Sequence, residues 1–181
     1  MGGEIAHVET FSSKPKTSLE NVTAALLQHN TDGLLIIAGA LDTAMISQQI
    51  RKTGSSMPII SSGWAMTEAL IHQGGSAVEG IVFSHLINKE SQDKRYLDFK
   101  GRFNNRFGQE PDFAAIHGYL AARILFDALS RTADPKKLKK SLLEKKTIHE
   151  FVGDFKMDKY GDPKRPRYLI TIRNGRLTTM E

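Results

Sequence analysis

Cysteine is absent from this chain of 181 residues, and tryptophan occurs only once. Without cysteine the chain cannot form a disulfide, a cysteine-ligated zinc site or a thiol nucleophile. The absence of cysteine is compatible with both a reducing cytosol and a bacterial periplasm. The hydrophobic share of 40% and the charged share of 25% are ordinary for a globular protein. These values argue against a disordered chain and a coiled coil.

Long apolar runs are also absent. No run approaches the roughly 18 residues that suggest a membrane-spanning helix, and residues 1–10 lack the apolar core of a secretory signal. We expect that this stretch of chain neither spans a membrane nor carries a general export signal.

Acidic residues are outnumbered by basic residues, which leaves a net charge of +5. Much of the positive charge lies in the lysines of residues 136–146, where Leu138, Leu142 and Leu143 have the spacing of a buried helix stripe. No aromatic residues alternate with these lysines, as a platform for stacking nucleic-acid bases would require. We interpret the lysines as a solvated helix face and expect no nucleic-acid partner.

Short apolar runs alternate with amphipathic segments over residues 4–84. The expected strands are residues 4–10, 34–38, 57–61 and 80–84, and the expected helices are residues 17–29, 42–53 and 64–72. The run LLIIA at residues 34–38 is typical of a strand that is buried on both faces of a parallel sheet. This alternation predicts an α/β fold class with a parallel sheet flanked by helices.

The pattern changes after residue 84. Three helices are expected at residues 92–107, 112–129 and 135–144, and the first has an aromatic stripe at helical spacing, made of Tyr96, Phe99, Phe103 and Phe107. The closing stretch, FVGDFKMDKYGDPKRPRYLITIRNGRL at residues 151–177, is typical of a pair of strands with turns at residues 160–163 and 174–175. We therefore expect a helical segment at residues 85–150 and a C-terminal pair of strands within residues 151–181.

Small and polar residues follow the expected strands at residues 34–38 and 57–61. The candidate ligand-binding residues are Gly39, Ala40, Asp42, Ser62, Gly63 and Trp64. In open α/β sheets, ligands bind beyond the carboxyl ends of parallel strands, where small residues allow close approach to the backbone. Trp64 offers a flat apolar wall, and Asp42 and Ser62 offer polar contacts. Two other interpretations stay open, in which Asp42 only caps its helix and Trp64 lies in the core.

Motifs that indicate catalysis or metal binding are missing. No two of the six histidines lie four residues apart with a glutamate between them, and the chain has no glycine-rich phosphate loop. Ser62 follows a strand and precedes a helix, as a nucleophilic serine does, but the sequence assigns it no histidine or acid partner. We expect no enzyme activity, no cofactor and no metal.

The order of these segments resembles a known family. The segments that carry the resemblance are DGLLIIAG, MPIISSGW, AVEGIVFS, NNRFGQEPDFAAIHGYLAARILFDAL and the closing stretch. Together they are similar to the C-terminal half of the periplasmic substrate-binding proteins of ABC importers, of the branched-chain amino acid (Leu/Ile/Val) type, which have the type I periplasmic binding fold.

The resemblance implies a two-lobed fold, a periplasmic location and a membrane permease as partner. In such proteins two α/β lobes joined by a hinge hold a small ligand between them. Residues 4–84 resemble part of the second lobe, residues 85–150 resemble helices of the first lobe, and residues 151–181 resemble the crossover and strands that return to the second lobe. The sheet of the first lobe, with the opening strand and helix of the second, would then be missing from this chain.

Two departures from the family pattern bear on the ligand. Amino-acid binders of this family carry a carboxylate for the ligand ammonium where this chain has Ser62, Gly63 and Trp64, and often an aromatic residue near Gly39 and Ala40. The implied ligand is an amino acid or a related small organic or aromatic acid. An aromatic acid packed on Trp64 is at least as plausible as a branched-chain amino acid.

The missing lobe leads to two further expectations. The chain alone should bind such ligands weakly or not at all, and the helices from residue 92 onward should expose an apolar face bearing Tyr96, Phe99 and Phe103, which favours a homodimer. Two other functions are considered beside the solute-binding one. They are a cytosolic ligand-sensing domain with the same fold and, with less support, an α/β enzyme that uses Ser62 or Asp42.

Overall fold

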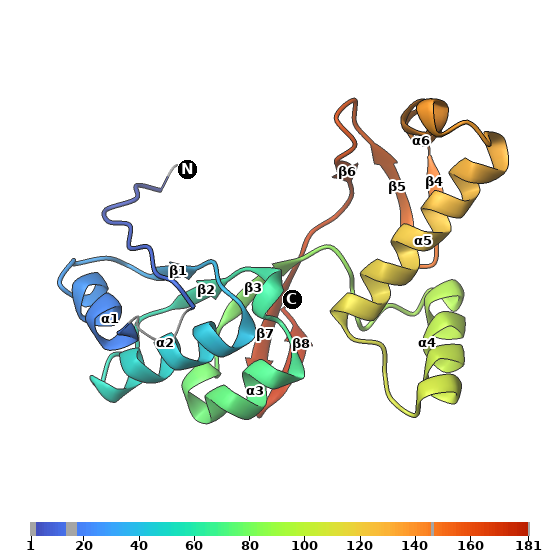
Figure 1. Cartoon of the computed structure of the whole chain (residues 1–181). Helices are drawn as coiled ribbons and strands as arrows, with labels where there is room; N and C mark the ends of the chain where they lie inside the picture. The colour runs from blue at the N-terminus through green and yellow to red at the C-terminus, as the bar shows by residue number, and fades with distance from the viewer. Residues whose placement is uncertain (1–2, 14–17, 146, 181) are drawn as a thin grey trace. The chain divides into compact units, whose positions relative to one another are not determined.

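Two compact units make up the chain (Figure 1). The computed structural model describes residues 3–13, 18–145 and 147–180. Unit 1 comprises residues 1–85 and 169–181, and unit 2 comprises residues 86–168. Thr17, the expected start of the first helix, lies outside the described residues. Within the described ranges no helix is both long enough and apolar enough to cross a membrane.

A five-stranded sheet in the order β1-β2-β3-β7-β8 is the framework of unit 1. The three strands β1 (Leu34–Ile36), β2 (Ile59–Ser61) and β3 (Val82–His85) run parallel, and Leu35 lies opposite Ile60. The strands β7 (Tyr168–Arg173) and β8 (Arg176–Thr179) form an antiparallel hairpin beyond β3. The predicted α/β fold class is confirmed.

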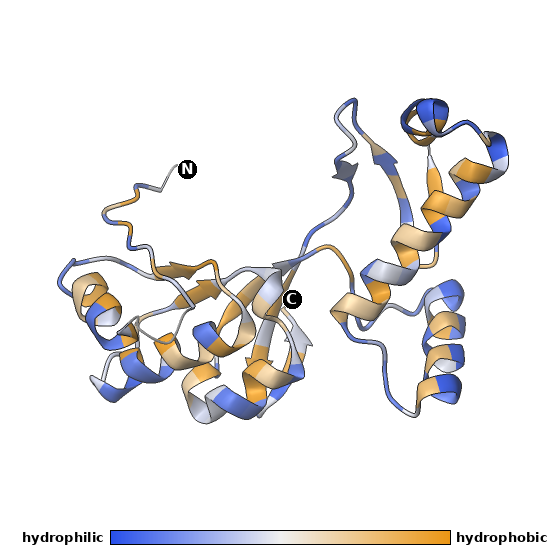
Figure 2. Ribbon diagram, viewed as in Figure 1, coloured by the Kyte–Doolittle hydropathy of each residue, from blue (hydrophilic) through white to orange (hydrophobic). Residues whose placement is uncertain are grey.

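Three helices cover one face of this sheet, as Figure 1 shows: α1 (Leu19–Leu27), α2 (Ala40–Lys52) and α3 (Glu68–Gly74). The expected helix at residues 64–72 is instead a short 3-10 helix, η1 (Gly63–Ala65), followed by α3. The apolar sides of the helices and the strands meet in a core that includes Ile46, Ile50, Ile59, Leu70, Ile81 and Phe83. The alternation of apolar and polar colour along these elements is visible in Figure 2.

The strand expected at residues 4–10 is not formed, so that expectation was wrong. This segment is extended and mostly exposed, and the ring of His7 stacks on the ring of His29 with 4.0 Å between their centres. A strand is stabilised by the hydrogen-bond ladder with a neighbouring strand. Among the described residues no strand pairs with residues 4–10, and the alternating pattern alone does not supply a ladder.

Unit 2 combines helices with a small antiparallel sheet. Its helices are α4 (Lys94–Phe107), α5 (Phe113–Arg131) and α6 (Leu138–Glu144), with a 3-10 turn η3 (Pro135–Lys137) before α6. Its strands are β4 (Ile148–Glu150), β5 (Gly153–Met157) and β6 (Pro163–Lys164), in that order in the sheet. The side chains of Asp93 and Asp112 cap the beginnings of α4 and α5 by accepting backbone N–H groups of the first turn.

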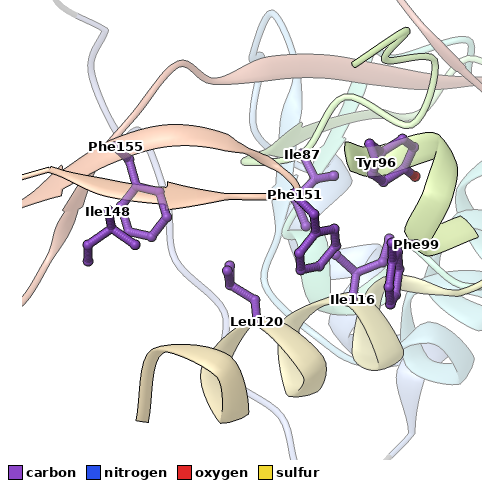
Figure 3. Packing of buried hydrophobic residues seen from close by; sticks show 8 residues of the cluster. All are labelled: Ile87, Tyr96, Phe99, Ile116, Leu120, Ile148, Phe151 and Phe155. Atoms are coloured by element: carbon purple, nitrogen blue, oxygen red, sulfur yellow. The ribbon is translucent and has the colours of Figure 1, made fainter. Parts of the chain in front are cut away.

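An apolar cluster holds the elements of unit 2 together (Figure 3). Its buried members are Ile87, Tyr96, Phe99, Ile116, Leu120, Ile148, Phe151 and Phe155. The rings of Phe99 and Phe151 lie 4.3 Å apart between centres. Tyr96 and Phe99 are only 2% and 4% exposed, and Phe103 packs against the same cluster. The expectation that these residues form an exposed face was therefore wrong, because α5 and the β4–β5 hairpin cover them.

The closing stretch is divided between the two units. We expected its strands to return to the sheet of unit 1, and β7 and β8 do lie there, but β5 and β6 pair with β4 in unit 2. The turn between β5 and β6 is organised by Asp158, whose carboxylate accepts the N–H groups of Tyr160, Gly161 and Asp162. The expected turn at residues 174–175 is confirmed, with both residues at positive φ between β7 and β8.

Glu79 ties this last turn to the rest of unit 1. Its carboxylate accepts the backbone N–H of Asn174 at 3.0 Å and that of Gly175 at 2.7 Å. Nearby, the N–H of Gly80 donates to the carbonyl of Ile172 at 3.0 Å. These contacts hold the β7–β8 hairpin to the loop that precedes β3.

We predict that Glu79→Ala lowers the free energy of unfolding of unit 1 by about 1 kcal/mol, because two backbone N–H groups lose a charged acceptor. Urea unfolding followed by the fluorescence of Trp64 measures this, since the chain has one tryptophan and it lies in unit 1. Glu4→Ala, at an exposed residue, serves as the matched control. Equal unfolding midpoints for the two variants would contradict the prediction.

An ion-pair network joins the start of α4 to the β4–β5 hairpin. Arg95 contacts Asp93 at 2.7 Å and Asp154 at 2.9 Å, and His149 contacts the other oxygen of Asp154. The pKa of Asp93 and the pKa of Asp154 are both lowered, in each case chiefly by hydrogen bonds from Arg95. Both carboxyl groups therefore bind protons less readily in the folded state than in the unfolded state.

This network predicts acid sensitivity of unit 2. A carboxyl group whose pKa is lowered by folding stabilises the folded state fully at pH values above its ordinary pKa of 3.8. This stabilisation is lost as the pH falls through the lowered pKa of the folded state. Arg95→Gln should therefore show a shallower loss of stability below that pH than the unchanged chain. Urea unfolding at several acidic pH values, followed by circular dichroism, tests this, with Arg102→Gln as control. Parallel pH profiles for Arg95→Gln and the unchanged chain would refute the assignment.

Candidate functional site

The carboxyl ends of β1, β2 and β3 lie at one edge of the sheet, because the three strands are parallel and neighbouring. The end of β2 and the loop that follows it are hydrogen-bonded to the end of β1. The N–H of Ser62 and the hydroxyl of Ser61 each donate to the carbonyl of Ile36, both at 3.1 Å. The predicted residues of the first two loops are therefore gathered at one edge, as the sequence led us to expect.

Gly39, Ala40 and Asp42 form the beginning of α2. Gly39 is the N-cap, with φ −74° and ψ 173°, so its conformation is open to any residue type. A Cβ atom built on Gly39 meets no other atom within 4 Å, which means that open space lies beside its backbone. Ala40 is the first helical residue, and Asp42 lies in the first turn.

The carboxylate of Asp42 accepts a hydrogen bond from the hydroxyl of Ser13 at 2.6 Å. The capping position belongs to Gly39, and no side chain provides a capping hydrogen bond there. The interpretation of Asp42 as the cap of its helix was therefore wrong. A negative charge in the first turn still favours the helix through its dipole.

Ser62, Gly63 and Trp64 form the loop after β2. Trp64 is 74% exposed, so the interpretation of this residue as part of the core was wrong, and most of the indole surface faces solvent. The hydroxyl oxygen of Ser62 is buried and has no hydrogen-bond partner among the described residues. In the conformation described here Ser62 therefore offers the site its backbone more readily than its side chain.

His85 is a residue at this edge that the list of candidates omitted. It is the last residue of β3 and is 4% exposed. A Cβ atom on Gly63 would lie 3.6 Å from Cδ2 of the His85 ring and 3.5 Å from the carbonyl oxygen of Ser84. Its position at the end of the third parallel strand was the signal that sequence reasoning could have used.

The groups at this edge are suited to binding a small molecule. Backbone N–H groups at the start of α2, a carboxylate, small residues and an exposed indole can orient a small polar molecule. The hydroxyl of Ser61 donates to a carbonyl, and the hydroxyl of Ser62 has no hydrogen-bond partner among the described residues. In the same part of the chain no group of three His, Cys, Asp or Glu residues could hold a metal ion.

The opposite edge of the sheet has an open depression of about 620 Å³. It is lined by residues at the ends of α1 and α2, among them Leu27, His29, Thr31, Thr53 and Met57. The ends of helices carry partial negative charge from free carbonyl groups, which disfavours the carboxylate of an acid. We therefore keep the carboxyl edge of the strands as the candidate site.

Comparisons with known proteins place this geometry in a family context. The family model described as periplasmic binding protein matches residues 1–176. A Leu/Ile/Val-binding protein homolog 1 from Brucella suis is 27% identical over 134 residues, which are 71% of this chain and 35% of that relative. The matched stretch is thus about a third of the length of this curated relative.

Solved structures show the same fold. A leucine-binding protein from Thermotoga maritima superposes with a TM-score of 0.85 at 23% identity, covering 95% of this chain and 50% of that one. The branched-chain amino acid transporter substrate-binding protein of Streptococcus pneumoniae, in complex with isoleucine, gives 0.81 at 19% identity, covering 97% and 51%. A solute-binding protein of an ABC transporter from R. palustris, in complex with benzoate, gives 0.76 at 18%, covering 98% and 50%.

The chain therefore spans about half the length of these structures, and its fold is that of their corresponding half. The family model matches residues 1–176, which is nearly the whole chain. The chain belongs to the periplasmic binding protein family.

Proposed function

We propose that the chain acts as part of the solute-binding component of an ABC-type importer, in the periplasm, with a membrane permease as partner and without enzyme activity. The observation that carries this proposal is the family match over residues 1–176. The structural neighbours named above support it, since they include transporter substrate-binding proteins described with isoleucine and with benzoate.

We also propose a correspondence with the lobes of such proteins. Residues 4–84 would belong to the second lobe, residues 85–150 would supply helices of the first lobe, and residues 151–181 would return to the second lobe. The membership of β7 and β8 in the sheet of unit 1 supports the last part, whereas β5 and β6 lie in unit 2.

The proposed ligand is an amino acid or a small organic or aromatic acid, bound at the loops that follow β1 and β2. The exposed indole of Trp64 can pack against an apolar or aromatic body. The open space beside Gly39 and the N–H groups at the start of α2 suit a carboxylate. The contacting residues would be Gly39, Ala40, Asp42, Ser62, Gly63 and Trp64.

Titrations of the chain with benzoate and with isoleucine, followed by Trp64 fluorescence, test this site. We expect a weak but saturable change with at least one of the two. Gly39→Leu should weaken that binding by about tenfold or more, because its side chain fills the open space beside the backbone, which corresponds to about 1.4 kcal/mol. The fold should be kept, since Gly39 has an ordinary φ.

Gly101→Leu is the matched control, because Gly101 lies in α4 and a Cβ atom there also meets open space. It should bind as the unchanged chain does. The proposed site is wrong if Gly39→Leu and Gly101→Leu bind the compound equally well.

We further propose that the chain forms a homodimer through the face of the unit 1 sheet that the three helices leave uncovered. Leu35 and Ile60, which lie opposite each other on β1 and β2, are 61% and 50% exposed. Parallel sheets are normally covered on both faces, so an apolar face of this kind favours association.

Leu35→Lys should raise the dimer dissociation constant by about tenfold or more, because a charge replaces an apolar contact worth about 2 kcal/mol. Sedimentation velocity measures this, with Ile5→Lys as control at another exposed apolar residue. A monomer at all accessible concentrations of the unchanged chain would exclude the dimer.

A further inference from the structure

The helix α6 is attached to the end of α5 through Ser141. The hydroxyl of Ser141 donates to the carbonyl of Ala128 at 3.1 Å, and a terminal nitrogen of Arg131 donates to the carbonyl of Ser141 at 2.9 Å. Ser141 is only 6% exposed. One side of α6 is therefore held against α5. Residues that lie about half a helical turn away from Ser141 point away from this contact.

Three lysines and a leucine lie on the outward side of η3 and α6. Lys136 and Lys140 are four residues apart, as are Lys139 and Leu143, so each pair occupies neighbouring turns of one helix face. These four residues, together with Glu144, line an open hollow of about 480 Å³. We call the four residues the lysine face.

The positive charge of the lysine face is only partly balanced. Lys140 lies 3.6 Å from Glu144, and both side chains are exposed, so water screens this pair strongly. Lys136 and Lys139 have no acidic partner among the residues that the structure describes. Residues 134–145 contain five lysines but only two acidic residues. The face is therefore a local centre of positive charge on unit 2.

The surface of an anionic membrane matches both the charge and the apolar residue of this face. Clustered lysines attract acidic lipid headgroups, and their long stems let the charged ends reach phosphate groups while Leu143 contacts the layer below. Nucleic acid is a poorer match, because no aromatic residues alternate with these lysines. An acidic protein surface would match the charge but would not use the apolar centre of the hollow.

We propose that the lysine face binds the surface of membranes that contain anionic phospholipid. The contact is peripheral and electrostatic, with the lysines above the headgroups. This inference goes beyond the function proposed above, because the partner is the lipid surface itself. It requires neither the solute nor the permease.

Sedimentation of the whole chain with lipid vesicles tests the proposal. One set of vesicles contains phosphatidylcholine alone, and the other contains phosphatidylcholine and phosphatidylglycerol in equal parts. We expect binding to the mixed vesicles and none to the neutral vesicles. Binding should disappear at about 1 M salt, where charges are screened over about 3 Å.

The double variant Lys136→Glu/Lys139→Glu should bind the mixed vesicles about tenfold or more weakly, because two attractive charges become repulsive. The matched control is Lys156→Glu/Lys159→Glu, at two exposed lysines on β5 and in the turn that follows it. The control changes the net charge equally and should bind nearly as the unchanged chain does. Circular dichroism verifies the fold of each variant, and Lys136→Gln/Lys139→Gln replaces the first variant if it does not fold.

Three results would each overturn the proposal: no binding to the mixed vesicles, equal binding to the neutral vesicles, or an equal loss in the two double variants. Polyglutamate tests the other partner. If it releases most of the chain when added at the same concentration of negative charge as the vesicles, the face prefers an acidic polypeptide and the proposal is wrong. The titrations with benzoate and isoleucine report on the proposed solute site separately.

Discussion

The parallel pairing of β1, β2 and β3 is the constraint on which unit 1 depends. Parallel strands require a crossover between them, and here α2 and α3 supply it while burying Ile46, Ile50 and Leu70 against the sheet. The same pairing brings the carboxyl ends of β1, β2 and β3 to one edge of the sheet. The candidate site is therefore a consequence of packing, since the loops converge only because the strands beneath them are in register.

Unit 2 depends on a different interaction, the aromatic cluster around Phe99 and Phe151 (Figure 3). This cluster brings together residues of α4, α5 and the β4–β5 hairpin that lie far apart in the sequence. Close packing of large rings gives a small unit much of its stability.

Much of the fold followed from patterns of the sequence. The run LLIIA and the helix stripes predicted the type and order of most elements, because apolar periodicity is a local property. The strand expected at residues 4–10 failed for the converse reason. Its alternation is local, but a strand also needs a partner, and pairing is decided by the rest of the fold.

The α/β class and the two strand ends near which Gly39, Asp42, Ser62 and Trp64 lie could be predicted from local patterns of the sequence. The environment of each side chain depends on the folded structure: Trp64 faces solvent, the Ser62 hydroxyl is buried, and Asp42 accepts a hydrogen bond from Ser13. It likewise decided that Tyr96 and Phe99 are covered and that the closing stretch is split between two sheets. Burial and pairing depend on residues distant in the chain, and no local pattern records them.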